Sequence, residues 1–217
     1  MKLLLTSAGL TNKSIIKAFE ELIDFPKDKV RIAFVPTAAN VEEGDKGWLI
    51  DDLGRLKQQG YGCVDIVDIS AVSKDIWHPR LEDANVIFVG GGNTFHLMHW
   101  FQESGLDDLM PKLLKTRVYA GISAGSCITG PTIYNSVQNL FGEKYNLQIK
   151  EGLGLIDFQF IPHLNSPYFD KIREEYLKEA AKDLKEPVYA ADDNTAVKVV
   201  DGQITVISEG KHLIYNK

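Results

Sequence analysis

Ser123 lies in the sequence Gly-Ile-Ser-Ala-Gly at residues 121–125, between a short apolar run and a helical pattern. This context is typical of a nucleophile elbow, a tight strand-to-helix turn that raises a serine hydroxyl above the edge of a sheet. Glycine is needed on both sides because side chains there would clash with the closely approaching backbone. The pattern therefore favours nucleophilic catalysis by Ser123. The alternative is an ordinary glycine-rich turn that binds a phosphate or nothing.

Three consecutive glycines, Gly90, Gly91 and Gly92, form a second pattern between a buried strand and a helix. Such a loop presents backbone N–H groups to an anion, which could be a phosphate or the oxyanion of a tetrahedral intermediate. It is not a P-loop, because no Gly-Lys-Ser or Gly-Lys-Thr follows, and the dinucleotide-binding spacing is missing. The remaining alternative is a plain strand-end turn, although ordering three glycines costs considerable chain entropy.

A serine nucleophile needs a base, and the sequence offers five histidines. We select His163 because it follows a strand-like alternating run, and strand ends carry the site residues of α/β sheets. His78 precedes a proline and is expected in a surface turn, and His212 is expected in an exposed segment. His96 and His99 stand three residues apart on one expected helix, where a metal pair is the alternative, but no third ligand accompanies them.

A carboxylate that orients the imidazole would complete a catalytic triad. The candidates are Asp157, Asp170, Asp192 and Asp193, and turn chemistry is the competing explanation for the last two. Cys127 is a rival nucleophile, since a helix N-terminus would lower the pKa of a thiol, but we expect a packed core residue there.

Apolar runs alternate with amphipathic ones, which indicates an α/β protein whose mostly parallel sheet is covered on both faces. Near the C-terminus, Asp201-Gly202 between two alternating runs predicts a hairpin, so an antiparallel appendage should finish the sheet. The expected strands are 2–6, 30–35, 63–69, 86–89, 118–120, 188–191, 196–200 and 203–207, and the expected helices are 11–22, 48–59, 94–102, 106–115 and 168–184.

The composition is that of a globular protein, with 44% hydrophobic and 25% charged residues among 217. The length and the lack of a linker-like shift predict a single domain over residues 1–217. The net charge of -6 and the scattered cations argue against nucleic acid, and no apolar run is long enough for an export signal or a membrane span. With two cysteines, we expect a cytoplasmic monomer or homodimer without a metal, a cofactor or a membrane partner.

The two glycine motifs, together with Gly-Pro-Thr at residues 130–132, resemble those of the peptidase E family of serine peptidases. That family includes aspartyl dipeptidases and, more distantly, cyanophycinases. The resemblance covers nearly the whole chain, and the two motifs together are much more specific than either alone. It implies a flavodoxin-like, doubly wound α/β fold related to the class I glutamine amidotransferases.

The resemblance also implies roles for the motif residues. Ser123 matches the nucleophile of the family, and His163, in Ile-Pro-His, matches its general base. The glycine loop matches the oxyanion-hole region, so the donors should be Gly91 and Gly92, helped by the N–H of Ala124.

Asp193 falls where relatives carry a Glu or Asp that orients the histidine, and a shift by one residue would select Asp192 or Asn194. Some members carry the acid shortly after the nucleophile instead. In this chain residues 131–140 contain no acid, and Gln138 stands near that position. The later acidic turn is therefore favoured.

The function implied is hydrolysis of small peptides, dipeptides above all, through an acyl-enzyme. A preference for an N-terminal Asp would need a fixed cation, best an arginine fork. Arg173, expected on a helix after His163, resembles a family position suited to this task. The alternative for Arg173 is a solvated charge paired with Glu174 or Glu175.

Asn93 and Thr94, which end the glycine loop, are the other residues expected to bind substrate. The main alternative function is a non-catalytic module that holds a small anionic metabolite on the same fold. A glutamine amidotransferase usually needs cysteine where Ser123 stands. An α/β-hydrolase esterase has the order Ser, acid, His, whereas the order here is Ser123, His163, Asp193.

Overall fold

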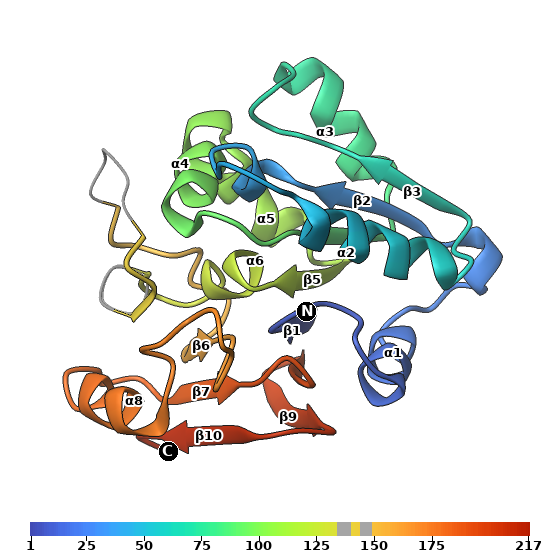
Figure 1. Cartoon of the computed structure of the whole chain (residues 1–217). Coiled ribbons are helices and arrows are strands. Elements are labelled where there is room, and N and C mark those ends of the chain that lie inside the picture. Colours follow the sequence, from blue (N-terminus) through green and yellow to red (C-terminus); the bar gives the residue numbers. More distant parts are fainter. Residues whose placement is uncertain (134–139, 144–148) are drawn as a thin grey trace.

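The computed structural model describes residues 1–133, 140–143 and 149–217. Among these residues a seven-stranded sheet has the order β3-β2-β4-β5-β1-β8-β9 (Figure 1). The strands from β3 to β1 are parallel, and β8 and β9 add an antiparallel hairpin beside β1, as expected. The members of the sheet are β1 (Lys2–Thr6), β2 (Arg31–Val35), β3 (Cys63–Ile66), β4 (Val86–Val89), β5 (Val118–Ile122), β8 (Thr195–Val200) and β9 (Gln203–Ser208).

The middle strands are apolar on both faces because helices cover both faces. In β1, Leu3 and Leu5 join one core cluster and Leu4 joins the other, and all three are fully buried. Alternation of side chains across a strand produces this division. The continuous apolar run of β1 is thus the signature of a two-sided core.

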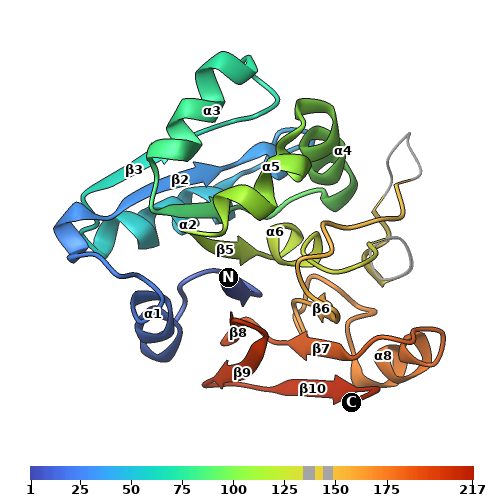
Figure 2. The same cartoon turned by 180° about the vertical axis from the view of Figure 1, so that it is seen from behind.

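The helices divide between the two faces in the same way. The cluster of Leu4 includes side chains of α1 (Lys13–Glu20) and α2 (Gly47–Gln58). The cluster of Leu3 and Leu5 includes α3 (Lys74–Asp83), α4 (Thr94–Ser104) and α5 (Leu106–Leu113). Accordingly, α2 lies in front of the sheet in Figure 1, and α5 lies in front of it in the reverse view of Figure 2.

A smaller sheet with the order β10-β7-β6 lies beside the large one. It comprises β6 (Gln159–Ile161), β7 (Val188–Ala191) and β10 (His212–Tyr215), and α8 (Glu174–Ala181) packs against it. Phe160 and Tyr189 from this sheet belong to the same core cluster as Leu3 and Leu5. The shared apolar core therefore fixes the position of the smaller sheet against the large one.

The helix expected over 168–184 is shorter than its charge pattern suggested, since α8 begins only at Glu174. The preceding residues form a loop of short turns, and a side chain adds hydrogen bonds to carbonyl groups that already accept backbone N–H groups. The guanidinium of Arg173 donates to the carbonyl oxygens of Ser166, Phe169 and Ile172. An arginine can thus hold a compact loop where amphipathic spacing predicts a helix.

Two other expectations differ from the structure. His78 and Pro79, expected in a surface turn, lie inside α3, where burial of Trp77 and Leu81 outweighs the hydrogen bond that proline cannot make. His212 is exposed, as expected, at the start of β10. The strand at 188–191 does not join the C-terminal hairpin in the large sheet, because β7 pairs with β6 and β10.

Candidate active site

The residues that could take part in catalysis lie where neighbouring strands end. Gly91 follows β4, Ser123 follows β5 and Ser7 follows β1, and these three strands are adjacent in the large sheet. His163 follows β6 and Asp193 follows β7 in the smaller sheet. Carboxyl ends of strands from both sheets therefore meet at one place, where ligands bind in open α/β sheets.

Ser123 occupies a strained backbone position between β5 and α6 (Ala124–Cys127), with φ 48° and ψ -109°. Its N–H donates to the carbonyl of Thr6 at 3.0 Å, which ties the turn to β1. Glycine is required two residues further on, since a Cβ at Gly125 would lie 2.2 Å from the carbonyl oxygen of Val89. This geometry is that of a nucleophile elbow, and strain of this kind is concentrated at functional sites.

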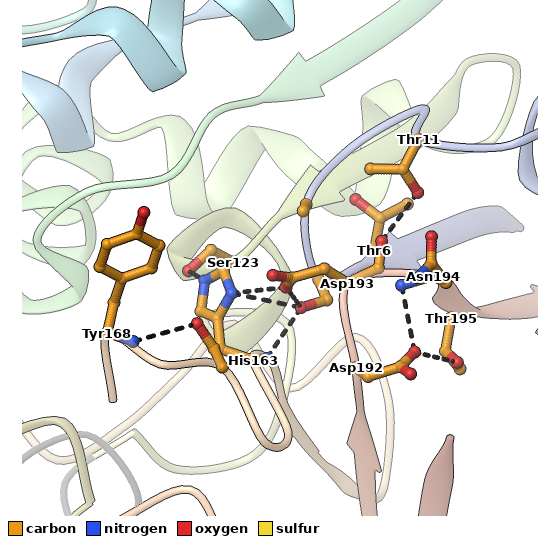
Figure 3. Close-up of polar contacts among 12 residues, drawn as sticks. Thr6, Thr11, Ser123, His163, Tyr168, Asp192, Asp193, Asn194 and Thr195 are labelled. Carbon is orange, nitrogen blue, oxygen red and sulfur yellow. Dashed lines mark hydrogen bonds and ion pairs between the residues drawn. The ribbon is translucent and has the colours of Figure 1, made fainter. Parts of the chain in front are cut away.

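Ser123, His163 and Asp193 form a continuous hydrogen-bonded series (Figure 3). Oγ of Ser123 lies 2.9 Å from Nε2 of His163, and Nδ1 of His163 lies 2.7 Å from Oδ1 of Asp193. The His163 side chain is 14% exposed, so the imidazole is sheltered on most sides but can be reached. These distances match a serine, a base and an orienting carboxylate.

The carboxylate of Asp193 is held in its ionised form. Partial burial acts to raise its pKa, but hydrogen bonds from His163 and Ser7 outweigh burial and lower the pKa below the ordinary value. An ionised Asp193 can only accept, so the proton on Nδ1 of His163 must point at it, which leaves Nε2 free to accept a proton from Ser123. The hydroxyl of Thr11 donates to the carbonyl oxygen of Asp193 at 2.8 Å, which holds the backbone of Asp193.

Asp192, the neighbouring candidate, is engaged in the turn itself. Its Oδ1 accepts from the N–H of Asn194 and from the hydroxyl of Thr195, and its Oδ2 accepts from the N–H of Lys211. The adjacent acids thus divide two tasks, because Asp192 builds the turn and Asp193 faces the histidine.

The backbone of His163 is also unusual, with φ 64° in the left-handed region. Two contacts hold this residue: its N–H donates to Oγ of Ser7 at 2.8 Å, and its ring stacks on Phe169 with centroids 4.7 Å apart and an interplanar angle of 19°. Phe169 belongs to the loop that Arg173 fastens. Ser7 had no signal in the sequence beyond its place at a strand end, and Phe169 had none.

The glycine loop lies directly against Ser123. A Cβ at Gly91 would lie 3.3 Å from Cβ of Ser123, and one at Gly92, whose φ is 129°, would lie 2.2 Å from the carbonyl oxygen of Ala38. Within the described part of the chain, the N–H groups of Gly91 and Gly92 have no acceptor. The N–H of Ala124 opens α6, where no intrahelical acceptor exists. Free donors therefore stand beside Ser123.

Asn93 and Thr94 lie in the same loop, but their polar groups fasten it. Asn93 is the N-cap of α4, and its side chain accepts from the N–H of His96. Thr94 donates from its N–H and its hydroxyl to Glu143, at 2.6 and 2.9 Å. Both residues are at least 94% buried, since Asn93 is 6% and Thr94 1% exposed. Glu143 had no recognisable signal in the sequence.

Arg173, expected on a helix, lies in the loop before α8 as its N-cap residue, with much of its guanidinium committed to backbone carbonyls. Among the described residues it forms no ion pair with Glu174 or Glu175. The arginine therefore braces the loop that carries Phe169.

The remaining candidates lie apart from this arrangement. Cys127 is buried, burial raises the pKa of its thiol, and its Sγ contacts the carbonyl of Phe160. Asp157 and Asp170 are exposed, and neither contacts His163. Gln138 lies outside the described residues. Within the described ranges no group of three His, Cys, Asp or Glu could hold a metal, so His96 and His99 gain no third ligand.

The chain is similar in sequence and in structure to known peptidases. The sequence model of peptidase family S51 matches residues 3–207. A protein of Nostoc sp. named peptidase E is 30% identical over 98% of this chain and 86% of its own length. An uncharacterized peptidase of Listeria innocua is 30% identical over 92% of this chain and 94% of its own. A crystal structure of a Listeria monocytogenes protein classed as peptidase E superposes with a TM-score of 0.80 at 25% identity, covering 96% and 98% of the two chains.

An α/β sheet with a serine elbow at its carboxyl edge defines a serine-type hydrolase architecture, and the comparisons specify its class. The chain belongs to peptidase family S51. It is an enzyme, a peptidase, and a serine mechanism is in keeping with the family. None of the helices in the described ranges is long and apolar enough to cross a membrane.

Proposed function

We propose that this chain hydrolyses short peptides by an acyl-enzyme mechanism, with Ser123 as nucleophile, His163 as general base and Asp193 as the orienting carboxylate. The observation that carries the proposal is the pair of contacts on the two imidazole nitrogens. Nε2 faces Ser123 at 2.9 Å and Nδ1 faces Asp193 at 2.7 Å. An imidazole fixed in this way presents a lone pair to the serine hydroxyl.

In the acylation step, Oγ of Ser123 attacks the carbonyl carbon of the scissile peptide bond while Nε2 of His163 takes the hydroxyl proton. The imidazolium then gives that proton to the nitrogen of the leaving amine, and the C–N bond breaks. Asp193, ionised because its pKa is lowered by hydrogen bonds that outweigh burial, stabilises the imidazolium. A water activated by His163 hydrolyses the acyl-enzyme by the same steps in reverse.

The carbonyl oxygen becomes negative in the tetrahedral intermediate and needs donors that are already in place. We assign this task to the N–H groups of Gly91, Gly92 and Ala124, which lie beside Ser123 without competing acceptors among the described residues. One such donor contributes about 3 kcal/mol to transition-state stabilisation. Asn93 and Thr94 serve the loop by holding its far end to α4 and to Glu143.

For the substrate, we propose dipeptides and other short peptides, with an N-terminal Asp as the narrower hypothesis. The guanidinium of Arg173 belongs to the loop that follows His163, which supports a cation near the site. Its bonds to Ser166, Phe169 and Ile172 mean that Arg173→Ala would also release the loop. The Asp preference is therefore tested on the wild-type enzyme, by comparing Asp-Leu with Ala-Leu.

The proposed mechanism is tested by hydrolysis of a dipeptide panel and by labelling with a serine-directed phosphonate. The wild type should cleave at least one member and become labelled, and Ser123→Ala should lose both properties. Cys127→Ala is the matched control, because Cys127 lies four residues further on and is buried away from the series. It should keep both.

Labelling that persists in Ser123→Ala would overturn the assignment of the nucleophile. Equal rates on Asp-Leu and Ala-Leu would keep the peptidase and remove the Asp preference. His163→Ala should retain the fold and lose labelling, because the hydroxyl of Ser123 is weakly nucleophilic without a base.

A further inference from the structure

Ser7 is fully buried at the end of β1, yet its hydroxyl contacts two members of the proposed catalytic series. It donates to Oδ1 of Asp193 at 2.6 Å and accepts from the backbone N–H of His163 at 2.8 Å. Its Oγ also lies 3.4 Å from Nδ1 of His163. One hydroxyl from the first strand thus meets residues that follow β6 and β7.

The number of protons that each group carries determines the direction of the hydrogen bond between Ser7 and Asp193. A serine hydroxyl has a single proton, and an ionised carboxylate has none to give, so the proton of Ser7 lies on the bond to Asp193. Nδ1 of His163 donates to the same oxygen, Oδ1, at 2.7 Å. Two donors that converge on one oxygen fix the direction of the carboxylate more tightly than one donor can.

The second contact acts on the backbone of His163. A residue other than glycine rarely adopts a φ of 64°, so the surrounding structure must hold His163 in this conformation. Oγ of Ser7 accepts the N–H of this residue. Ser7 is itself fixed, because the hydroxyl of the preceding Thr6 donates to the carbonyl of Gly121 and accepts from the N–H of Gly9.

Ser126 provides a comparison within the same region. It is also fully buried, and its hydroxyl accepts from the N–H of Thr6 at 3.0 Å and donates to the carbonyl of Thr6 at 2.9 Å. These bonds satisfy backbone groups alone. A buried serine at this edge can therefore be purely structural, and Ser7 differs because its partners are Asp193 and His163.

We propose that Ser7 is a positioning residue of the active site, which aims the Asp193 carboxylate at Nδ1 and holds the backbone of His163 so that Nε2 faces Ser123. The inference rests on the proposed serine mechanism. It adds a fourth side chain, from the N-terminal strand, to a series that otherwise joins β5 with the smaller sheet.

Ser7→Ala tests this, with Ser126→Ala as the control for loss of a buried hydroxyl. The measurements are the rate of phosphonate labelling at Ser123, kcat and KM on a cleaved dipeptide, and the pH profile of kcat/KM. Ser7→Ala should slow labelling and lower kcat by roughly a hundredfold with KM changed little, because small misplacements of a catalytic group have effects of this size.

The pH profile separates positioning from plain stability. Without the Ser7 proton, the Asp193 carboxylate has one donor fewer and attracts the imidazolium more strongly, so the acidic limb of kcat/KM should move to higher pH. Ser126→Ala should lower the thermal midpoint and leave the acidic limb where the wild type has it. A folded Ser7→Ala enzyme with wild-type labelling rate and an unmoved limb would overturn the proposal.

Ser7→Cys provides a second variant if the alanine variant does not fold. A thiol fills the site but donates only weakly, so it should slow labelling as alanine does. Wild-type rates in folded Ser7→Cys would also overturn the proposal. Failure of the wild type itself to react with the phosphonate would count against the serine mechanism, whereas equal labelling of wild type and Ser7 variants counts against Ser7 alone.

Discussion

The carboxylate of Glu143 accepts two hydrogen bonds from one residue, Thr94, through the backbone N–H at 2.6 Å and the hydroxyl at 2.9 Å. Thr94 is the first residue of α4, directly after the glycine loop that lies against Ser123. Glu143 therefore connects a distant segment to the helix end that supports the proposed oxyanion site.

This pairing predicts a specific pH dependence of stability. Burial raises the pKa of Glu143 from 4.5 to about 7, although the two bonds from Thr94 act to lower it. Between these values the folded state binds a proton that the unfolded state lacks, so the free energy of unfolding should fall as pH rises, by up to about 3 kcal/mol across the range. Glu143→Gln should remove that fall in urea unfolding curves measured from pH 5 to 8.

Asp52 provides the control for this experiment. Burial raises its pKa from 3.8 to about 6 despite the hydrogen bond from Arg55, so it adds a slope of the same sign at lower pH. Asp52→Asn should make the fall below pH 6 less steep and leave the fall between pH 6 and 7 in place. An unchanged slope in Glu143→Gln above pH 6 would show that another group titrates there.

Gly92 should tolerate no side chain. An alanine Cβ would lie 2.2 Å from the carbonyl oxygen of Ala38, and φ is 129°. Gly44 is the matched control, since its φ is also positive, 84°, and no atom lies within 4 Å of its Cβ position. Gly92→Ala should destabilise the protein by at least about 2 kcal/mol more than Gly44→Ala and abolish labelling of Ser123. Similar unfolding midpoints for both variants would contradict the close approach.

Arg173 should affect all substrates alike if its main task is to brace the loop of Phe169. Arg173→Lys keeps the charge but loses the planar set of donors that reaches the carbonyls of Ser166, Phe169 and Ile172. We expect a lower thermal midpoint and a similar fractional loss of activity on Asp-Leu and Ala-Leu. A selective loss on Asp-Leu would instead identify Arg173 as the group that contacts the substrate carboxylate.

Tyr168 should contact substrate, because it is 87% exposed on this braced loop and adjoins Phe169, which stacks on His163. Tyr168→Ala should raise KM about fivefold, the equivalent of about 1 kcal/mol for an aromatic contact, and leave kcat and the thermal midpoint unchanged. Tyr176→Ala is the control, since Tyr176 is 48% exposed on α8. Equal KM values for both variants and the wild type would place Tyr168 outside the substrate path.

Local patterns in the sequence pointed to those parts of the fold and of the candidate site that are determined locally. Ser123 is marked by glycines that the tight turn requires, and the parallel strands are marked by continuous apolar runs. His163 could be selected because it ends a strand. These signals lie within a few residues of the group they identify.

Other parts could not be predicted, because their determinants are distant in the chain. Ser7 and Glu143 are ordinary residues in sequence and gain significance only from partners 186 and 49 residues away. The helix expected from residue 168 begins late for a related reason, since backbone turn bonds and the side chain of Arg173 together hold the preceding residues in a loop. The spacing of apolar residues shows which face of a helix is apolar. It does not show which polar side chain will form hydrogen bonds with backbone groups elsewhere.

The first strand has a consequence for the order in which the protein is made. β1 lies between β5 and β8, and Ser7 at its end meets Asp193, which precedes β8 by a short turn. During synthesis Ser7 therefore cannot meet Asp193 until the segment that carries β7 and Asp193 has left the ribosome. A chain of this design assembles its proposed active site only once β7 and β8 have folded back beside β1.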